Sequence, residues 1–338
     1  MTPFQYARAN DVADAIKQIA TDPSAKFIAG GTNLIDLIKY DVEGPVRLID
    51  ISHLPLRSVE QTAAGGVRIG AMVPNTDLAY HPLIEERYPL LARAILSGAS
   101  QQLRNMASTG GNLLQRTRCF YFYDTATPCN KREPGSGCSA IEGVNRINAI
   151  LGTSESCIAT HPSDMCVALA ALDATVHVAG PAGARTIAFA DFHRLPGTTP
   201  QRDSNLEPDE IITAIELPPK GFSANYSYLK IRDRLSYAFA LVSVAAALEL
   251  DGDTIKEARL ALGGVAHKPW RSSAAEIILR GERADASAFA RAADILLRGA
   301  KGYGHNNFKI GLARRAIVRT LGQAARGTPQ SLSDKKIR

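Results

Sequence analysis

The stretch "AKFIAGGTNLIDLIK", residues 25–39, joins a short apolar run to an amphipathic segment through a pair of glycines. The apolar run Phe27–Ala29 predicts a strand, and the spacing of apolar residues from Leu34 onward predicts a helix. Glycine reaches positive φ and lets a bulky group approach the backbone, while the N-terminus of a helix carries partial positive charge. The turn Ala29–Asn33 therefore suits a phosphate, with a plain tight turn between strand and helix as the alternative.

A second glycine pair lies in "ASTGGN", residues 107–112, with two hydroxyl side chains before it and an amide after it. This pattern predicts a second turn of the same chemistry. Neither stretch matches the GxGxxG fingerprint of a Rossmann domain or the GxxxxGK[ST] pattern of a P-loop. Two such turns in one chain suit a long diphosphate ligand that is held from both sides.

Four of the five cysteines lie in one region, which begins with "CFYFYDTATPCNKREPGSGC" at residues 119–138 and has the spacing C-x9-C-x8-C-x18-C. Disulfides, structural zinc and a 4Fe-4S cluster are the three alternatives. The chain shows no export signal that would favour disulfides, and it lacks the closely spaced ligand pairs that are typical of zinc. A cluster needs four thiolates, which a long excursion of the chain can supply. The fifth, Cys166, lies in an apolar helical stretch and is predicted to be a small buried hydrophobe.

The composition is that of an ordinary globular protein of two or three domains, with 338 residues, 45% hydrophobic and 21% charged. No window approaches the roughly 18 consecutive apolar residues of a membrane-spanning helix, so we expect no membrane insertion. The net charge of +6 is modest and no arginine-rich strip alternates with aromatics, so we expect no binding of nucleic acid. The N-terminus lacks a basic region followed by an apolar core, so no signal peptide is expected.

The remaining patterns predict both helices and strands. Helical spacing runs through residues 4–19, where Asn10 and Asp11 supply a plausible N-cap. A Pro-Gly turn region at residues 218–221 indicates a domain boundary. The other expected elements are strands within 46–52, 65–73, 209–219 and 226–271, helices within 76–100, 285–299 and 311–326, and a helix that passes into a strand within 164–180.

Four segments, "KFIAGGTNLIDLIK", "STGGNLLQRTRC", "CIATHPSDM" and "YLKIRDRLSYAFALVSVAAAL", together resemble the FAD-binding medium subunit of the xanthine dehydrogenase family of molybdenum hydroxylases. The resemblance covers essentially the whole chain, in order. Within the family it is nearest to the FAD subunits of bacterial periplasmic aldehyde oxidoreductases. In these, as in the medium subunit of hydroxybenzoyl-CoA reductase, an inserted loop holds an extra 4Fe-4S cluster, whereas xanthine dehydrogenase itself lacks the insertion.

The resemblance implies an α+β fold. A two-subdomain FAD-binding domain of the vanillyl-alcohol-oxidase or PCMH type would be followed by a C-terminal sheet-and-helix domain of the molybdenum-hydroxylase flavoprotein type, with FAD between the two subdomains. The expected boundaries are 1–220 for the FAD-binding domain, about 1–58 and 59–220 for its subdomains, about 116–160 for a cluster-binding insertion, 221–330 for the C-terminal domain and 331–338 for a frayed tail.

The resemblance also implies a cofactor site. The first glycine turn would wrap the FAD diphosphate, with the amides from Ala29 to Asn33 as the main donors. The second loop would close over the same diphosphate and the ribityl chain. The residues so implied are Lys26, Phe27, Ile28, Ala29, Gly30, Gly31, Thr32, Asn33 and Leu34 in the first segment and Ser108, Thr109, Gly110, Gly111 and Asn112 in the second.

Further residues match family positions near FAD. Asp164 matches an acid that helps to hold FAD, Ile212 an apolar residue that packs on the flavin, and Lys230 a basic residue near the flavin ring. Each has a plainer alternative, namely a helix N-cap, a core strand residue and a solvated charge at a strand end. Arg232 and Tyr237 would shape the open face of the flavin.

The resemblance assigns the 4Fe-4S cluster to the cysteine-rich loop. His161 and His267 are expected to be structural or surface groups, because the sequence places no constellation of ligands around them. The implied cluster ligands are Cys119, Cys129, Cys138 and Cys157.

In this family a large molybdopterin subunit hydroxylates the substrate, and a small subunit with 2Fe-2S clusters passes the electrons to the flavin. The resemblance therefore implies an oxidoreductase subunit of a heterotrimeric complex that transfers electrons from reduced FAD to an external acceptor. The alternatives are the medium subunit of a hydroxybenzoyl-CoA reductase-like complex, in which electrons run the other way, and a zinc-stapled binding module without a redox role.

The acceptor stays open among O2, a quinone, a small electron carrier and NAD, as does the place of the 4Fe-4S cluster on or off the electron path. The resemblance favours a periplasmic location, reached as the passenger of an exported partner. The cytoplasm is the alternative, because the chain shows no signal peptide of its own.

Overall fold

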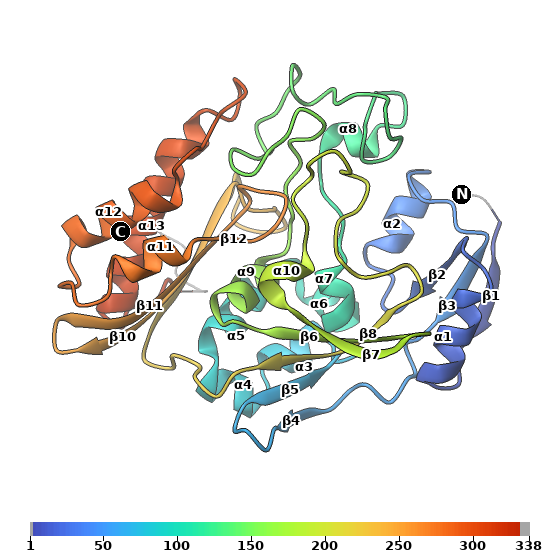
Figure 1. Cartoon of the computed structure of the whole chain (residues 1–338), viewed down its shortest axis with the longest axis horizontal. Helices are drawn as coiled ribbons and strands as arrows, with labels where there is room; N and C mark the ends of the chain where they lie inside the picture. The colour runs from blue at the N-terminus through green and yellow to red at the C-terminus, as the bar shows by residue number, and fades with distance from the viewer. Residues whose placement is uncertain (1–2, 332–338) are drawn as a thin grey trace.

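Three β-sheets carry the fold in a computed structural model that describes residues 3–331 (Figure 1). The first sheet has the strand order β1-β3-β2, and its neighbouring strands are parallel. Parallel neighbours need crossover connections, which here contain the helices α1 and α2. The bounds are β1 (Gln5–Arg8), α1 (Val12–Ala20), β2 (Ala25–Ile28), α2 (Leu34–Lys39) and β3 (Arg47–Asp50).

The expected helix over residues 4–19 is wrong in its first part. Residues 5–8 form strand β1 because they pair in parallel with β3. Helix α1 begins only after Asp11, whose carboxylate accepts a hydrogen bond from the Asp14 amide at 2.8 Å. This N-cap stops the helical pattern from extending back to the N-terminus.

The second sheet has five strands in the order β4-β5-β8-β6-β7, and all its neighbours are antiparallel. Helix α7 contacts β5 and β8 of this sheet, and α9 packs against α5. The bounds are β4 (Val59–Gln61), β5 (Val67–Gly70), α3 (Asn75–Ala79), α4 (Pro82–Arg87), α5 (Pro89–Ser97), α6 (Gln101–Met106), α7 (Thr109–Leu113), α8 (Phe120–Tyr123), α9 (Asp164–Ala171), β6 (Thr175–Gly180), β7 (Gly183–Ala188), α10 (Phe189–Phe192) and β8 (Ile211–Leu217).

The third sheet, with the antiparallel order β12-β11-β10-β9, is covered on one face by the last helices of the chain. Successive residues of a strand point to opposite faces. On β10, Ala245 and Ala247 belong to the core that extends through the first two sheets, whereas Val244 and Ala246 belong to the core beneath α12 and α13. The bounds are β9 (Asn225–Ile231), β10 (Val242–Asp251), β11 (Thr254–Gly263), β12 (Trp270–Arg271), α11 (Ser273–Ile277), α12 (Ala286–Leu296) and α13 (Phe308–Ala325).

The predicted insertion at residues 116–160 has little regular structure apart from the short helix α8, and it lies at the top of the view in Figure 1. Buried charges attach it to the body of the protein. Arg116 Nε donates to the Asp203 carboxylate at 2.9 Å, and the buried Lys131 ammonium donates to the same carboxylate and to the Pro200 carbonyl. These ionic contacts add to the apolar packing of buried side chains such as Phe122 and Ile158.

The three sheets lie within residues 5–50, 59–217 and 225–271. Most of the predicted tail, residues 332–338, lies outside the described part of the chain. Within residues 3–331, no helix combines the length and the apolar character that crossing a bilayer requires.

Tyr88 ties the second sheet region to the turn that leads into the third sheet. Its fully buried side chain donates a hydrogen bond to the Pro218 carbonyl at 2.6 Å. In Tyr88→Phe this carbonyl loses its donor, and we expect the free energy of unfolding to fall by about 1–2 kcal/mol in urea titrations. Tyr80→Phe, on an exposed ring, is the matched control and should change stability by less than about 0.5 kcal/mol. Equal losses in the two variants would contradict the role of Tyr88.

Candidate functional site

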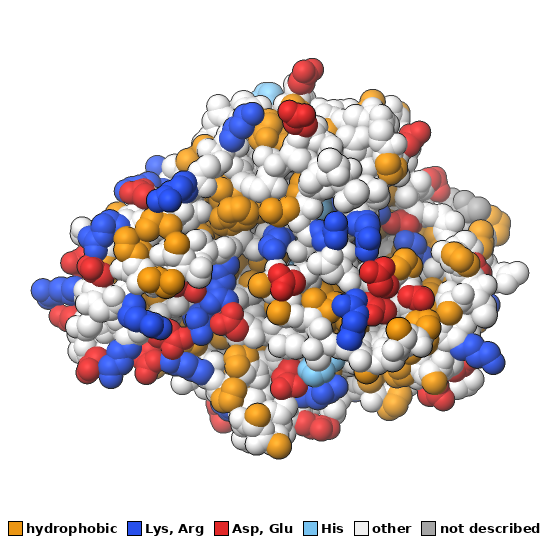
Figure 2. Space-filling model, in the orientation of Figure 1, with side chains coloured by type: hydrophobic (Ala, Val, Ile, Leu, Met, Phe, Trp, Pro, Cys, Tyr) orange, Lys and Arg blue, Asp and Glu red, His pale blue; other side chains and the backbone are white. Residues whose placement is uncertain are grey.

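A cavity of about 1080 Å³ lies where parts of the chain from all three sheets meet. Its walls come from the β2–α2 turn, the ends of α6 and α7, the start of α9, and strands β8 and β9. Ligand sites usually have volumes of about 300–1,000 Å³, so the size suits a long ligand such as a dinucleotide. Lys and Arg side chains gather near the middle of the molecular face seen in Figure 2, interspersed with acidic ones.

The turn Ala29–Asn33 offers free amides to this cavity. Among residues 3–331, no protein acceptor receives a hydrogen bond from the amides of residues 30–33. Gly31 has a φ of +70°, which glycine adopts without strain. A Cβ on Gly30 would lie 1.8 Å from the Met106 carbonyl oxygen, so only glycine permits the contact between this turn and the end of α6. Consecutive free amides before a helix are typical of an anion site.

The second glycine pair differs from the first, because residues 109–113 form the short helix α7 instead of the predicted turn. Ser108 caps this helix and accepts a hydrogen bond from the Gly111 amide at 3.2 Å. The other amides of residues 109–112 donate to backbone carbonyls, including those of Val73 and Ala71. The two glycine pairs are therefore not equivalent, since the second has no amide left for an anion within residues 109–112.

All but one of the residues predicted to hold FAD line the cavity. The exception is Thr109, which is buried and donates its hydroxyl to the Val73 carbonyl at 2.8 Å. Tyr237 lines the cavity from an exposed loop, whereas Arg232 lies outside the lining and donates to the Ser97 carbonyl. The predicted residues that line the cavity are Lys26, Phe27, Ile28, Ala29, Gly30, Gly31, Thr32, Asn33, Leu34, Ser108, Gly110, Gly111, Asn112, Asp164, Ile212 and Lys230.

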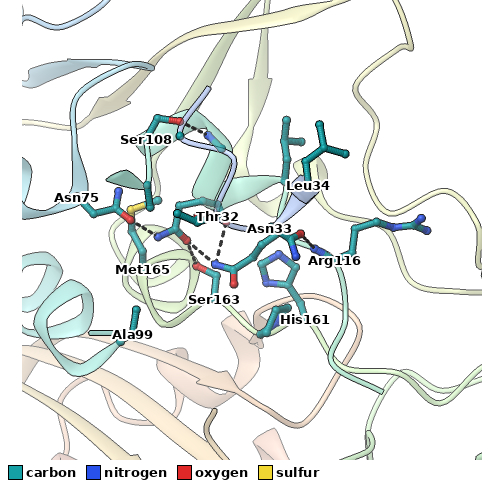
Figure 3. A pocket seen from close by; sticks show the side chains of 18 of the residues that line it. Thr32, Asn33, Leu34, Asn75, Ala99, Ser108, Arg116, His161, Ser163 and Met165 are labelled. Atoms are coloured by element: carbon teal, nitrogen blue, oxygen red, sulfur yellow. Dashed lines mark hydrogen bonds between the residues drawn. The ribbon is translucent and has the colours of Figure 1, made fainter. Parts of the chain in front are cut away.

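A ladder of polar side chains holds one wall of the cavity in place (Figure 3). Asn112 donates to Asn75 Oδ1 at 2.6 Å and accepts a hydrogen bond from the Ser163 hydroxyl at 2.6 Å. The ladder therefore joins the starts of α3 and α9 through the last turn of α7. Within residues 3–331, the buried Nδ2 atoms of Asn33 and Asn75 have no acceptor. Such donors fit a ligand that brings its own oxygen or nitrogen acceptors.

Asp164 and Lys230 form a buried ion pair at the wall of the cavity, 2.7 Å apart, with side chains that are only 7% and 4% exposed. The Tyr228 hydroxyl donates to the other carboxylate oxygen at 2.7 Å. Burial and the nearby carboxylate raise the pKa of Tyr228 well above its usual value, so the phenol remains a donor. The plain alternatives of a helix N-cap and a solvated lysine do not describe these side chains, because Ser163 caps α9.

Arg104 also lines the cavity, but the sequence analysis did not identify it. It lies on α6, donates to the Gly98 carbonyl at 2.7 Å, and has no carboxylate within 4.0 Å among the described residues. Burial lowers its pKa, which stays high enough for the guanidinium to be charged. The sequence signal was only a basic residue shortly before the second glycine pair.

The four predicted cluster ligands surround one small internal cavity of about 10 Å³. All are unbridged thiols, and three of them are buried. They belong to a separate small core that includes Leu37 and Phe122. One segment of the insertion contributes to both cavities, because Arg116, Arg118 and Phe120 line the large cavity. Thr117 and Cys119, which alternate with them along the chain, line the small cavity of the cysteine cage. The cysteine cage consists of Cys119, Cys129, Cys138 and Cys157.

Hydrogen-bond donors point at the sulfur atoms of the cage. The Ala159 amide donates to Cys157 Sγ at 3.4 Å, and Asn148 Nδ2 donates to Cys119 Sγ at 3.5 Å. The hydrogen bond from the Cys157 thiol lowers the pKa of Cys138 to about 6, with help from backbone amides. Amide donors around sulfur stabilise thiolates and are a feature of iron–sulfur sites.

The prediction that no constellation of ligands surrounds His161 is wrong. Ring nitrogens of His161 and His193 lie within 4.8 Å of each other and of Cys166 Sγ. Both rings bond to the Leu113 carbonyl through Nε2, which explains their position at the end of α7. Burial lowers the pKa of His193 to about 4, so its ring is neutral at neutral pH. His267 is also buried and is therefore not a surface group.

The sequence matches two known domain families along almost its full length. Residues 2–220 match the family described as the FAD binding domain in molybdopterin dehydrogenase, and residues 226–324 match the CO dehydrogenase flavoprotein C-terminal domain. The chain therefore belongs to the FAD-binding medium subunits of the xanthine dehydrogenase family. These subunits bind FAD and are parts of oxidoreductases that work as multi-subunit complexes.

Individual relatives narrow the comparison. The chain is 52% identical over 326 residues to the aldehyde oxidoreductase FAD-binding subunit PaoB of Escherichia coli, covering 96% of this chain and 99% of that one. It is 28% identical to the glyceraldehyde dehydrogenase medium chain of Sulfolobus acidocaldarius, covering 83% and 82% of the two chains. Among solved structures, quinoline 2-oxidoreductase from Pseudomonas putida matches with a TM-score of 0.74 at 25% identity over 97% of this chain and 98% of that one.

Gly30→Ala tests the close approach of the first turn to α6. The new Cβ would force the turn away from the Met106 carbonyl, so the free amides would no longer line up. We expect at least tenfold weaker FAD binding, about 1.4 kcal/mol, measured by flavin content and by titration of the stripped protein. Gly44→Ala is the matched control, because its Cβ would meet no atom within 4 Å. Unchanged affinity in Gly30→Ala would show that the amides of the turn do not hold FAD.

Lys230→Met tests the buried ion pair. It leaves the Asp164 carboxylate buried without its cation, and we expect a loss of about 3–5 kcal/mol in the free energy of unfolding. The double variant with Asp164→Asn removes both charges and should recover more than half of that loss in the same urea titration. A double variant as unstable as the single one would show that packing, not charge, explains the effect.

Proposed function

We propose that this chain is the FAD- and 4Fe-4S-containing electron-transfer subunit of a molybdenum aldehyde oxidoreductase. It would take electrons from a small 2Fe-2S subunit, beside a large molybdopterin-binding subunit, and pass them from reduced FAD to an external acceptor. The observation that carries the proposal is that one segment, residues 116–120, lines both a four-cysteine cage and a cavity of dinucleotide size. The 52% identity to an aldehyde oxidoreductase subunit supports the substrate class.

The residues of the cavity fit FAD. The free amides of residues 30–33 would bind the diphosphate, and the unpaired guanidinium of Arg104 would balance its charge. Ile212, on a buried strand, would pack on the flavin ring. FAD, when bound, supplies redox chemistry that accepts electrons singly or in pairs. Since Asp164 neutralises Lys230, this pair would position polar atoms beside the cofactor without adding net charge.

The cysteine cage fits a 4Fe-4S cluster better than zinc. The chain lacks the closely spaced ligand pairs that are typical of zinc. The Ala159 amide and the Asn148 side chain donate to sulfur atoms of the cage, and such donors are a feature of iron–sulfur sites. A binding module that zinc holds together, without a redox role, is therefore the weaker alternative.

The hydroxybenzoyl-CoA reductase-like complex is an alternative within the same fold, and sequencing the neighbouring large subunit would separate the two. Aldehyde oxidation by the purified complex, assayed with O2, quinones, small electron carriers and NAD, would identify the acceptor. We propose a periplasmic location as the passenger of an exported partner, which cell fractionation would test. Complex found only in the cytoplasm would contradict that location.

Cys129→Ser should remove the cluster and leave FAD bound, because the amides of residues 30–33 lie outside the cage. We expect a loss of about four irons per FAD, with the flavin absorption retained. Cys166→Ala, which removes a buried thiol outside the cage, is the matched control and should keep the iron. Zinc in place of iron in the anaerobically purified wild-type complex would overturn the proposal. Loss of flavin together with iron would contradict the separation of the two sites.

A further inference from the structure

Lys309 is a buried cation without an anionic partner. It lies at the start of α13, and none of its side chain is exposed. Its ammonium donates to the Asn148 carbonyl at 2.7 Å, to the Ile147 carbonyl at 3.4 Å and to the Gly264 carbonyl. Among residues 3–331, no carboxylate lies within 4.0 Å of the ammonium. Carbonyl dipoles alone therefore hold this charge.

The position is costly for a cation. An ammonium taken out of water without a counter-ion is strongly destabilising, and the first turn of a helix carries partial positive charge. Burial lowers the pKa of Lys309 to about 7, and no neighbouring group offsets the effect. A side chain of this kind calls for an anion that the protein residues themselves do not supply.

The carbonyls that hold Lys309 belong to the walls of both proposed cofactor sites. Ile147 and Gly264 line the large cavity. Asn148 lies beside the cysteine cage, since its side-chain amide donates to Cys119 Sγ at 3.5 Å. One residue, Asn148, therefore separates the ammonium from a sulfur atom of the cage.

The other buried lysine near the cage has its charge balanced. Lys131 is 2% exposed and forms an ion pair with Asp203, which also binds Arg116. Its charge is thus shared within a network of the insertion and the body of the protein. Lys309 lacks such a partner, so it is the better candidate for a charge that serves a bound group.

We infer that Lys309 is the counter-charge of the 4Fe-4S cluster and raises its reduction potential, an inference that rests on the proposed function. Four thiolates outweigh the positive charge of the iron–sulfur core, so the ligated cluster is an anion, and it becomes more negative when it takes up one electron. The anionic cluster raises the pKa of the Lys309 ammonium again, so the side chain stays protonated beside it. This positive charge stabilises the reduced form more than the oxidised form. In this step one electron is added, and neither a covalent bond nor a proton moves. Lys309 touches no reacting atom and is a positioning residue.

The test is a redox titration of the purified complex, in which the measured quantity is the EPR signal that Cys129→Ser abolishes. Lys309→Met removes the charge and keeps the apolar stem. A unit charge about 10 Å away, at an effective dielectric constant of about 20, changes the ratio of oxidised to reduced cluster roughly tenfold. For a one-electron couple this is a shift of about 59 mV, here to more negative potential.

Asn306 supplies a matched control and a second test, because its Nδ2 donates to the Ala149 and Asn148 carbonyls of the same segment. Asn306→Ala removes these hydrogen bonds without changing charge. At a given potential, it should change the ratio of oxidised to reduced cluster by less than about twofold. Asn306→Asp places a carboxylate beside the ammonium and should lower the reduction potential of the cluster. This variant tests the role of the Lys309 charge if Lys309→Met does not hold a cluster.

An unchanged potential in Lys309→Met, or in Asn306→Asp where Lys309→Met fails, would overturn the inference. So would an equal shift in Asn306→Ala, because the potential would then follow the shape of the segment and not its charge. A wild-type complex that lacks the Cys129-dependent EPR signal would overturn the proposed cluster itself. A normal EPR signal with an unchanged potential in Lys309→Met would overturn only the role of Lys309.

Discussion

The cavity depends on one close contact, in which the first glycine turn meets the Met106 carbonyl at the end of α6 so closely that no side chain fits between them. The turn ends strand β2, which is held by its parallel pairing with β3. The opposite segment is equally fixed, since the amides of α7 donate to the loop that follows β5. Two rigid segments thus approach each other, and the amides of residues 30–33 keep no acceptor within the described chain. The free amides of the anion site therefore result from this packing.

Local patterns in the sequence identified the first turn because strand, glycine pair and helix follow one another directly. They failed at the second glycine pair, where the conformation is set by Val73 and Ala71, residues far away in the sequence. The N-cap signal of Ser108 was present, but the adjacent glycines favoured a turn. Arg104 and Lys309 could not be predicted, because no carboxylate of residues 3–331 lies within 4.0 Å of either side chain, which only the folded chain reveals. The resemblance to the family supplied Asp164 and Lys230, whose ion pair joins helix α9 to strand β9.

The insertion shows how a segment with little regular structure can be held on a protein surface. Arg116, Lys131 and Asp203 form a buried group of charges at its base, and Arg116 also pairs with Glu43 of the first subdomain at 2.7 Å. Buried ion pairs are screened by salt much less than surface pairs. Burial alone would raise the pKa of Asp203, but the positive charges of Lys131 and Arg116 hold it well below its ordinary range. Its carboxylate therefore remains ionised and the attachment persists at mildly acidic pH.

The cysteine cage is also tied to the last part of the chain. Asn145 donates to the Tyr303 carbonyl, and Asn306 and Lys309 bond to carbonyls of residues 147–149. All four thiols lie within residues 119–157, but their outer support, residues 303–309, is synthesised later. Assembly of this region thus waits for that later segment, so iron–sulfur loading on a nascent chain would meet an unfinished pocket.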